Sequence, residues 1–218
     1  MECFKKTLPL GLLAACCSLP ALAQINCAPG APGVNPLPVQ IGGGLVNSRI
    51  NPQISQRHIF CGEINGAGAA VGYHSRPAGH DPRLGALPAS PVAARITAGQ
   101  QYFVEPPAVG AAGPYRYLGG GIEVDNAGVW VAKGGAGVSS FYPDSCTQVQ
   151  VIASVRYAYT HPLQSVGGGN FFSGPSAPSV GAAGYCVGEA GNPFTIGGFL
   201  NNIGGLWTIN TAYPIGNF

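Results

Sequence analysis

Two histidines and one lysine are the residues of this chain best suited to acid–base and electrostatic chemistry. His58 opens the run HIFCGEI, and His74 ends the run GAAVGYH sixteen residues later. Near neutral pH, one of two paired imidazoles can hold a proton while the other accepts one, which suits in-line attack on a phosphodiester. Lys133 follows the apolar run VWVA, and its ammonium can stabilise the charge that builds on a phosphorane. The Ser139–Ser140 pair lies just beyond it and can orient the lysine.

Other kinds of site have weaker support in the sequence. His80 and His161 stand in loops marked by glycine and proline, where solvated side chains are expected. A metal site built from His80 and the two histidines above lacks Cys-x-x-Cys or His-Glu-x-x-His spacing, and the nearby carboxylates Glu63 and Asp81 look incidental. We therefore expect no metal. A serine hydrolase would need a Gly-x-Ser-x-Gly turn, which the chain lacks, and a catalytic cysteine would need a free thiol.

The sequence predicts strands for the elements that position the two histidines. Apolar runs over Ile59–Ile64 and Ala69–Tyr73 flank Asn65-Gly66, a pair that tight hairpin turns prefer. This pattern predicts a hairpin that brings His58 and His74 to one rim. Further strand-like runs lie at Arg95–Thr97, Tyr102–Val104, Gly121–Val124, Val129–Ala132, Phe194–Leu200 and Leu206–Tyr213, the last two joined by a turn through Asn201–Gly205.

One helix has a clear start signal. Thr147 and Gln150 have capping-box spacing, and an apolar stripe at helical spacing follows. The stripe consists of Val151, Ile152, Val155, Ala158 and Tyr159. Many short strands with few helices predict an α+β domain of mainly antiparallel sheets.

The first residues predict an export signal. Two lysines precede an apolar stretch over Leu8–Ala21, which ends in the small-x-small pattern Ala21-Leu22-Ala23. Cleavage after Ala23 predicts a secreted or periplasmic protein. It divides the chain into a signal peptide (1–23), an extended leader rich in proline and glycine (24–55) and one domain (56–218). The alternative is a lipoprotein anchored at Cys16, which follows Leu-Ala-Ala; no later segment is apolar enough to span a membrane.

Cysteine number and charge limit the function further. Cleavage after Ala23 leaves an even set, Cys27, Cys61, Cys146 and Cys186, which permits two disulfides in three connectivities. Processing at Cys16 would leave an odd thiol at Cys17, so we favour full release. The formal net charge of the chain is only +2, which argues against a broad basic surface that grips nucleic acid.

Three runs in order resemble the bacterial branch of the EndoU endoribonucleases. They are RHIFCGEINGAGAAVGYHSRPAG (57–79), GVWVAKGGAGVSSFYPDS (128–145) and FTIGGFLNNIGGLWTINTAYPI (194–215), and the likeness covers roughly residues 57–216. The resemblance implies an RNase A-like α+β fold of antiparallel sheets. It also implies cleavage of single-stranded RNA 3′ to pyrimidines, often uridine, by 2′-hydroxyl attack that leaves a 2′,3′-cyclic phosphate. The reaction that the resemblance implies requires no cofactor, and stimulation by Mn²⁺ stays open.

The resemblance also assigns roles to individual residues. His74 is the expected general base, His58 the general acid, and Lys133 the group that stabilises the phosphorane. Thr211 and Tyr213 fall in the terminal Thr-Ala-Tyr-Pro motif and are expected in the substrate pocket. Ser140, in the Ser-Ser-Phe run, is placed with these substrate-binding residues.

Two departures from the family pattern and one alternative function accompany this reading. Cys146 and Cys186 stand where the family tends to carry aromatic residues, and we hypothesise that a disulfide between them replaces that packing. The alternative function is a secreted binding or surface module that kept the fold and lost the activity. An enzyme acting as a toxin would have a small immunity protein as partner, but the chain's own signal favours extracellular RNA degradation. The oligomeric state stays open.

Overall fold

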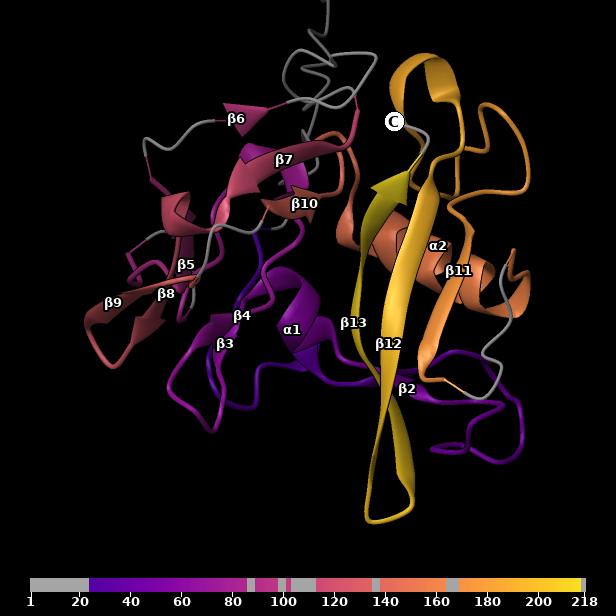
Figure 1. The fold of residues 1–218 in the computed structure, drawn as a ribbon, viewed down its shortest axis with the longest axis horizontal. Helices are drawn as coiled ribbons and strands as arrows, with labels where there is room; N and C mark the ends of the chain where they lie inside the picture. Colours follow the sequence, from indigo (N-terminus) through magenta and orange to yellow (C-terminus); the bar gives the residue numbers. More distant parts are fainter. Residues whose placement is uncertain are drawn as a thin grey trace, which may run out of the picture.

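The chain folds into two lobes around two buried apolar clusters. The computed structural model describes residues 24–85, 89–97, 101–102, 113–134, 138–163 and 169–216. The predicted signal peptide and residues 103–104 of one predicted strand lie outside these ranges. Figure 1 shows one lobe with α2 behind β11, β12 and β13, and the other lobe formed by smaller sheets. In the described residues, the only two α-helices lie among many strands, which confirms the predicted α+β class.

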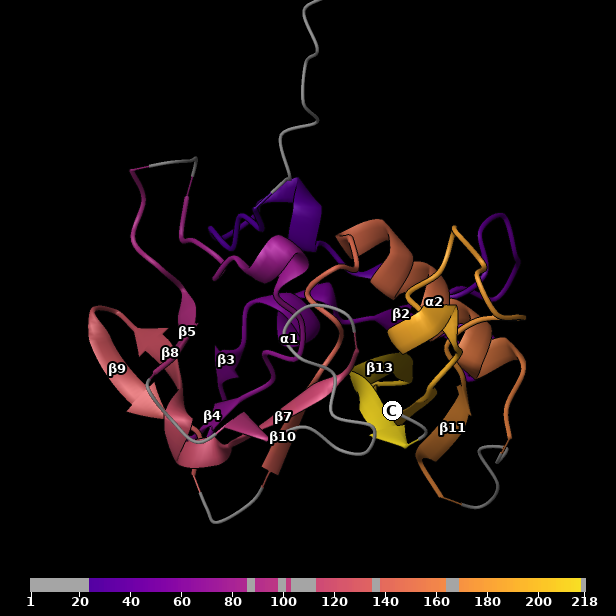
Figure 2. The ribbon, with the colours of Figure 1, turned by 90° about the horizontal axis from the view of Figure 1, so that it is seen from above.

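The first lobe is a five-stranded sheet with a helix on one face. Its strand order is β1 (Leu37–Pro38), β2 (Gln53–Ile54), β13 (Leu206–Gly216), β12 (Thr195–Ile203) and β11 (Phe171–Pro175). The β13–β2 pair is parallel and the other pairs are antiparallel. The helix α2 (Gln148–Thr160) buries its apolar stripe against β11 and β12, and Figure 2 shows that it lies on one side of the sheet only.

The second lobe consists of three small antiparallel sheets. One contains β10 (Val138–Phe141), β7 (Tyr115–Leu118) and β6 (Gln101–Tyr102). The others are β5 (Ala94–Ile96) with β8 (Ile122–Asn126) and β9 (Val129–Ala132), and the pair β3 (Glu63–Ile64) with β4 (Ala70–Val71). Their common core contains the stacked rings of Tyr115 and Phe141, whose centroids are 5.3 Å apart, with Tyr73 packed edge-on against Phe141.

Short helical turns complete the described structure. The second α-helix, α1, spans Gln56–Phe60 and lies between the lobes in Figure 1. Single 3₁₀ turns occur at Pro32–Val34, Pro77–Gly79, Gly119–Gly121 and Glu189–Gly191. Among the described residues, no helix has the length and apolar character needed to cross a lipid bilayer.

The predicted helix and most predicted strands are confirmed, but the first strand is wrong. The capping box of Thr147 and Gln150 starts α2 as expected. The run Ile59–Ile64 is not one strand, because α1 covers its first residues and only Glu63–Ile64 pairs with β4. The helix forms because the Ser55 hydroxyl caps it by accepting a hydrogen bond from the His58 N–H at 3.4 Å. His58 therefore lies on a helix and not at a strand end.

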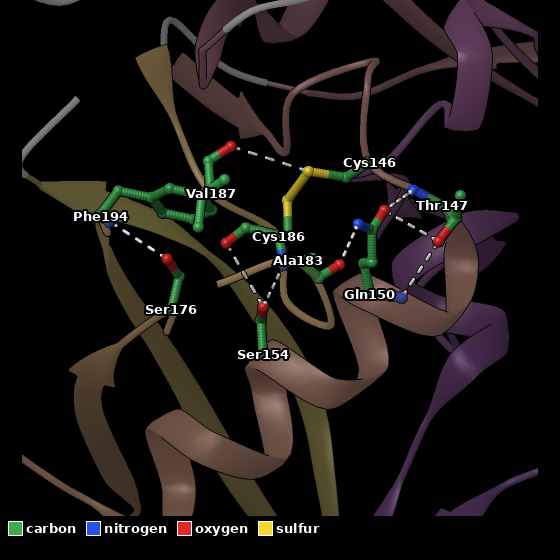
Figure 3. Close-up of a disulfide and its surroundings, with 9 residues drawn as sticks. All are labelled: Cys146, Thr147, Gln150, Ser154, Ser176, Ala183, Cys186, Val187 and Phe194. Atoms are coloured by element: carbon green, nitrogen blue, oxygen red, sulfur yellow. Dashed lines mark hydrogen bonds between the residues drawn. A yellow bond between two sulfur atoms is a disulfide. The ribbon is translucent and has the colours of Figure 1, made fainter. Parts of the chain in front are cut away.

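Two disulfides fix the connectivity that the sequence left open. Cys146 pairs with Cys186, as hypothesised, with Cα atoms 5.3 Å apart, and this bridge joins the start of α2 to the loop before β12 (Figure 3). Next to it, the Ser154 hydroxyl accepts a hydrogen bond from the Cys186 N–H at 2.8 Å. Cys27 pairs with Cys61, with Cα atoms 5.9 Å apart.

The segment 24–55 packs along the first lobe. Its apolar side chains join the buried cluster between α2 and the five-stranded sheet, and β1 and β2 form part of that sheet. The Arg57 guanidinium donates to the carbonyls of Cys27 and Ala28, both at 3.0 Å. The Cys27–Cys61 bridge is thus a covalent link between this segment and the end of α1.

We expect loss of the Cys27–Cys61 bridge to destabilise the protein. Replacing both cysteines with serine removes a crosslink between residues separated by 34 positions, and such a loop stabilises a fold by roughly 2–4 kcal/mol. The free energy of unfolding, measured in urea, should fall by that amount while the far-ultraviolet spectrum is retained. An unchanged urea midpoint would show that the segment 24–55 does not depend on this tether.

Candidate active site

His74 is buried where the two lobes meet. Its ring Nδ1 lies 2.9 Å from the carbonyl oxygen of Ser140 on β10, and its own carbonyl accepts a hydrogen bond from Tyr142 N–H at 2.8 Å. A carbonyl can only accept a hydrogen bond, so Nδ1 of His74 carries the ring proton and donates a hydrogen bond to the Ser140 carbonyl. The lone pair of the neutral imidazole is then on Nε2, the nitrogen that a general base uses.

The backbone of the His74 segment brings the two histidines together. Tyr73 N–H and His74 N–H donate to the carbonyls of His58 and Ile59, both at 2.7 Å. Gly72 has φ of +73°, and a Cβ at this position would overlap the His58 carbonyl, so only glycine allows this close approach. The two imidazole rings face each other with centroids 6.1 Å apart.

Tyr73 departs from the conformation that its side chain prefers. Its φ is +60°, although the ring is fully buried. The phenol donates a hydrogen bond to the Asp81 carboxylate at 2.5 Å, and the ring packs against Phe141. Left-handed backbone at a bulky residue costs about 1–3 kcal/mol, so these contacts hold a strained residue directly before His74.

His58 has a carboxylate partner. Its Nδ1 lies 2.7 Å from Oε1 of Glu63, at the start of β3. This hydrogen bond to His58 lowers the pKa of Glu63, so the carboxylate is charged at neutral pH. A carboxylate only accepts, so the Nδ1 proton of His58 is donated to Glu63, and Nε2 is the ring nitrogen that remains for exchange with a substrate.

Lys133 follows β9 and its ammonium is held by two acceptors. Its Nζ donates to the Gly72 carbonyl at 2.7 Å and to the Ser139 hydroxyl at 2.8 Å. An ammonium has three N–H donors, so one remains for an anion in the cleft. Burial lowers the pKa of Lys133 to about 8, because the charged form loses hydration.

The buried position of His74 also sets its charge. Desolvation, and then the positive charges of Lys133 and His58, hold the pKa of His74 well below its usual value, against the opposing effect of its hydrogen bond to Ser140. At neutral pH the ring is therefore a neutral base. Glu63 lies next to His58 and not next to His74, so the two imidazoles have different electrostatic surroundings.

A cleft of about 230 Å³ opens between β10, the end of β9 and β13. His74, Lys133, Ser140 and Tyr213 are among the residues that line it. The Tyr213 ring stacks on His74 with centroids 5.2 Å apart, and burial raises the pKa of its phenol. The Thr211 hydroxyl lies 3.5 Å from His74 Nε2, at the edge of a hydrogen bond.

All six residues singled out in the sequence gather here, but two details differ from the expectation. The Ser140 hydroxyl donates to the Pro214 carbonyl at 2.5 Å, so its side chain ties β10 to β13. Of the Ser139–Ser140 pair expected to orient the lysine, it is Ser139 that bonds to Lys133. Glu63, which looked incidental in the sequence, is the partner of His58. The only feature of the sequence that could have indicated this contact was the position of Glu63, five residues after His58. Asp81 pairs with Arg76.

The loop histidines lie outside the cleft. His80 and His161 are exposed, as expected, and His161 stacks on Tyr157 with centroids 4.0 Å apart. In the described ranges, no cluster of three or more histidine, cysteine, aspartate or glutamate side chains is arranged to hold a metal ion.

Two facing imidazoles, a desolvated ammonium and an adjoining aromatic pocket form a site suited to acid–base catalysis of phosphodiester transfer. The family described as Bacterial EndoU nuclease matches residues 52–216. This match covers most of the chain, and the protein belongs to that nuclease family. No curated protein matches the sequence significantly. No solved structure matches significantly either.

The altered pKa of Lys133 can be measured directly, because the chain from residue 24 contains no other lysine. In protein labelled with ¹³C-lysine, the single Cε resonance should titrate with a pKa near 8. The same protein in denaturant supplies the control, and its lysine should titrate near the ordinary value of about 10.4. A folded-state value of 10 or more would contradict the burial of this ammonium.

We expect Gly72→Ala to destabilise the protein more than a matched glycine substitution. Gly128 also has positive φ, but a Cβ there would meet nothing within 4 Å. Gly128→Ala should therefore cost only the backbone strain, about 1–2 kcal/mol. Gly72→Ala adds the overlap with the His58 carbonyl, and overpacking of this kind costs a further 1–3 kcal/mol, roughly.

Urea unfolding of both variants measures the difference between the two glycines. Equal losses in the free energy of unfolding would mean that the backbone around His58 moves freely away from residue 72. The approach of the two histidine segments would then not depend on glycine.

Proposed function

We propose that this nuclease is an endoribonuclease that cleaves single-stranded RNA 3′ to pyrimidines, often uridine, by attack of the ribose 2′-hydroxyl. The observation that carries the proposal is the neutral His74, whose Nδ1 proton is engaged by Ser140 and whose Nε2 is left as a base. The facing His58, bonded to a carboxylate, supplies the complementary acid. Family membership supports the same reading.

The proposed reaction transfers one proton at each end of the attacked phosphodiester. His74 Nε2 takes the proton of the 2′-hydroxyl as the 2′-oxygen bonds to phosphorus. The P–O5′ bond then breaks, and His58 Nε2 gives its proton to the departing 5′-oxygen. The products are a 2′,3′-cyclic phosphate and a free 5′-hydroxyl. Each proton transfer is worth about 10²–10⁴ in rate.

Lys133 and Glu63 support these steps without transferring a proton themselves. The third N–H of Lys133 is directed at the non-bridging oxygens of the phosphorane, where negative charge is greatest, and removal of such a donor costs about 10²–10³ in rate. Glu63 acts through His58, since its carboxylate orients the ring by accepting the hydrogen bond from Nδ1.

Selection of the base rests on Thr211 and Tyr213. The Thr211 hydroxyl can donate to or accept from a pyrimidine edge, and the Tyr213 ring can stack on the base or ribose. Ser140 shapes the same pocket by linking β10 to β13. The reaction uses only groups of the chain itself, so we propose that neither a metal nor a cofactor is required.

The two disulfides fit the oxidising compartment of a secreted or periplasmic protein. We propose that a signal peptide is removed after Ala23 and that RNA outside the cytoplasm is the substrate.

The first test is cleavage of an oligoribonucleotide with a single uridine by residues 24–218, in excess EDTA. We expect products that end in 2′,3′-cyclic phosphate, and no cleavage when that uridine is replaced by deoxyuridine, which lacks the nucleophile. His74→Ala should lower kcat/KM by about 10²–10⁴ because the general base is lost. The readout is mass spectrometry of the products.

His161→Ala is the matched control, because this histidine is exposed and distant from the cleft in the fold. Its activity should equal that of the unmodified protein. Absence of cleavage with and without Mn²⁺ would instead favour a binding module that retained the fold. Cleavage of the deoxyuridine substrate would rule out attack by the 2′-hydroxyl.

A further inference from the structure

The face of the five-stranded sheet opposite α2 carries a row of side chains that leads away from the cleft. The strand register places Phe171 opposite Phe199, and Phe199 opposite Thr211. Side chains opposite each other on neighbouring strands lie on the same face, with Cβ atoms about 5 Å apart. Figures 1 and 2 place α2 on the other side of the sheet. The second lobe meets this face at β13, where His74 stacks on Tyr213, whereas Phe199 on β12 remains exposed.

Phe199 is unusual among the described aromatic residues because it is exposed. Its accessible surface is 43% of that of a free residue, whereas Phe60, Phe141 and Phe172 are fully buried. The Phe171 ring packs against it at a centroid distance of 5.0 Å and an angle of 57°. One side of the Phe199 ring is therefore supported by protein while the ring remains accessible to solvent.

Glycine at position 197 allows this support. A Cβ there would lie 2.9 Å from the Ile215 side chain and 3.0 Å from Cζ of Phe171. Because this side chain is absent, Phe171 and Ile215 close over the backbone beside Phe199. The surface is thus a packed platform of Phe171, Phe199 and Ile215, and not a single protruding ring.

The platform is continuous with the cleft. Thr211 is the cross-strand neighbour of Phe199, and its hydroxyl lies 3.5 Å from His74 Nε2. Gly197 is in turn the cross-strand neighbour of Tyr213, which lines the cleft. An RNA strand that fills the cleft must leave it in some direction, and this aromatic surface begins one strand away.

We infer that Phe199, supported by Phe171, stacks on the nucleobase next to the pyrimidine held by Thr211 and Tyr213. This inference rests on the proposed ribonuclease function and adds a second base-binding site to it. Stacking on an aromatic side chain accepts every base, because each base has a π-face. The subsite therefore strengthens binding of longer RNA without adding sequence preference.

The test compares two substrates with wild-type protein and Phe199→Ala. One is a uridine flanked by adenosines, and the other is a uridine flanked by abasic ribose residues. We expect Phe199→Ala to lower kcat/KM about tenfold on the adenosine-flanked substrate, mainly through a higher KM, and to change the abasic substrate less than twofold. Substrates abasic on one side only identify which neighbour stacks.

Two further variants at this position separate stacking from simple burial. Phe199→Trp should retain the preference for flanking adenosine because its ring stacks, whereas Phe199→Leu should behave like Phe199→Ala. Val149→Ala serves as the matched control, since this side chain is 76% exposed on α2, on the opposite side of the sheet. It should leave both substrates unchanged.

The outcomes distinguish this inference from the proposed function. Equal loss on both substrates, or no loss on either, would overturn the stacking subsite while leaving the ribonuclease activity established. A wild-type protein that cleaves neither substrate would overturn the proposed function itself. Urea unfolding of each variant verifies that the compared proteins are folded.

Discussion

The site depends on keeping the His74 ring buried, and therefore desolvated, at the junction of the two lobes. Three backbone carbonyls do this: Ser140 accepts from the ring, and His58 and Ile59 accept from the backbone N–H groups of residues 73 and 74. Separation of the lobes would hydrate the ring and remove the desolvation that keeps it neutral. The Ser140 hydroxyl opposes such separation by bonding to the Pro214 carbonyl on β13. The same residue therefore fixes the tautomer and the cleft wall.

The burial of Lys133 beside His74 lowers the stability of the folded protein. A pKa near 8 in place of 10.5 means that the folded state disfavours the ammonium, by about 3 kcal/mol at order of magnitude. The sign follows from a folded pKa below the unfolded one. The cost is present in full below pH 8 and disappears as the pH rises from 8 through 10.5. The two acceptors, Gly72 and Ser139, offset only part of the lost hydration. Stability is thus given up where transition-state charge is expected.

Local signals in the sequence were sufficient for some elements and not for others. The capping box of Thr147 and Gln150 and the strand β9 depend on neighbours in the chain, and both were predicted. The helix α1 has five residues, too few to show a repeating pattern of apolar positions in the sequence. It is stabilised by the Ser55 cap and by its packing between the lobes. Glu63 was missed for the same reason, since it reaches His58 only when Gln56–Phe60 is helical. The contacts of His74 to β10 span 66 residues and have no local signal.

The charges of the chain explain why base contacts should matter more than phosphate contacts. Most arginines are engaged within the protein: Arg57 and Arg83 bind backbone carbonyls, and Arg76 and Arg95 pair with carboxylates. Arg95 also lies over the Trp130 ring at 3.9 Å. Among the described residues that line the cleft, Lys133 is the single lysine or arginine. Few counterions would be released on binding, so the affinity for RNA should depend weakly on salt. Aromatic surface beside the cleft is the remaining source of affinity that this composition allows.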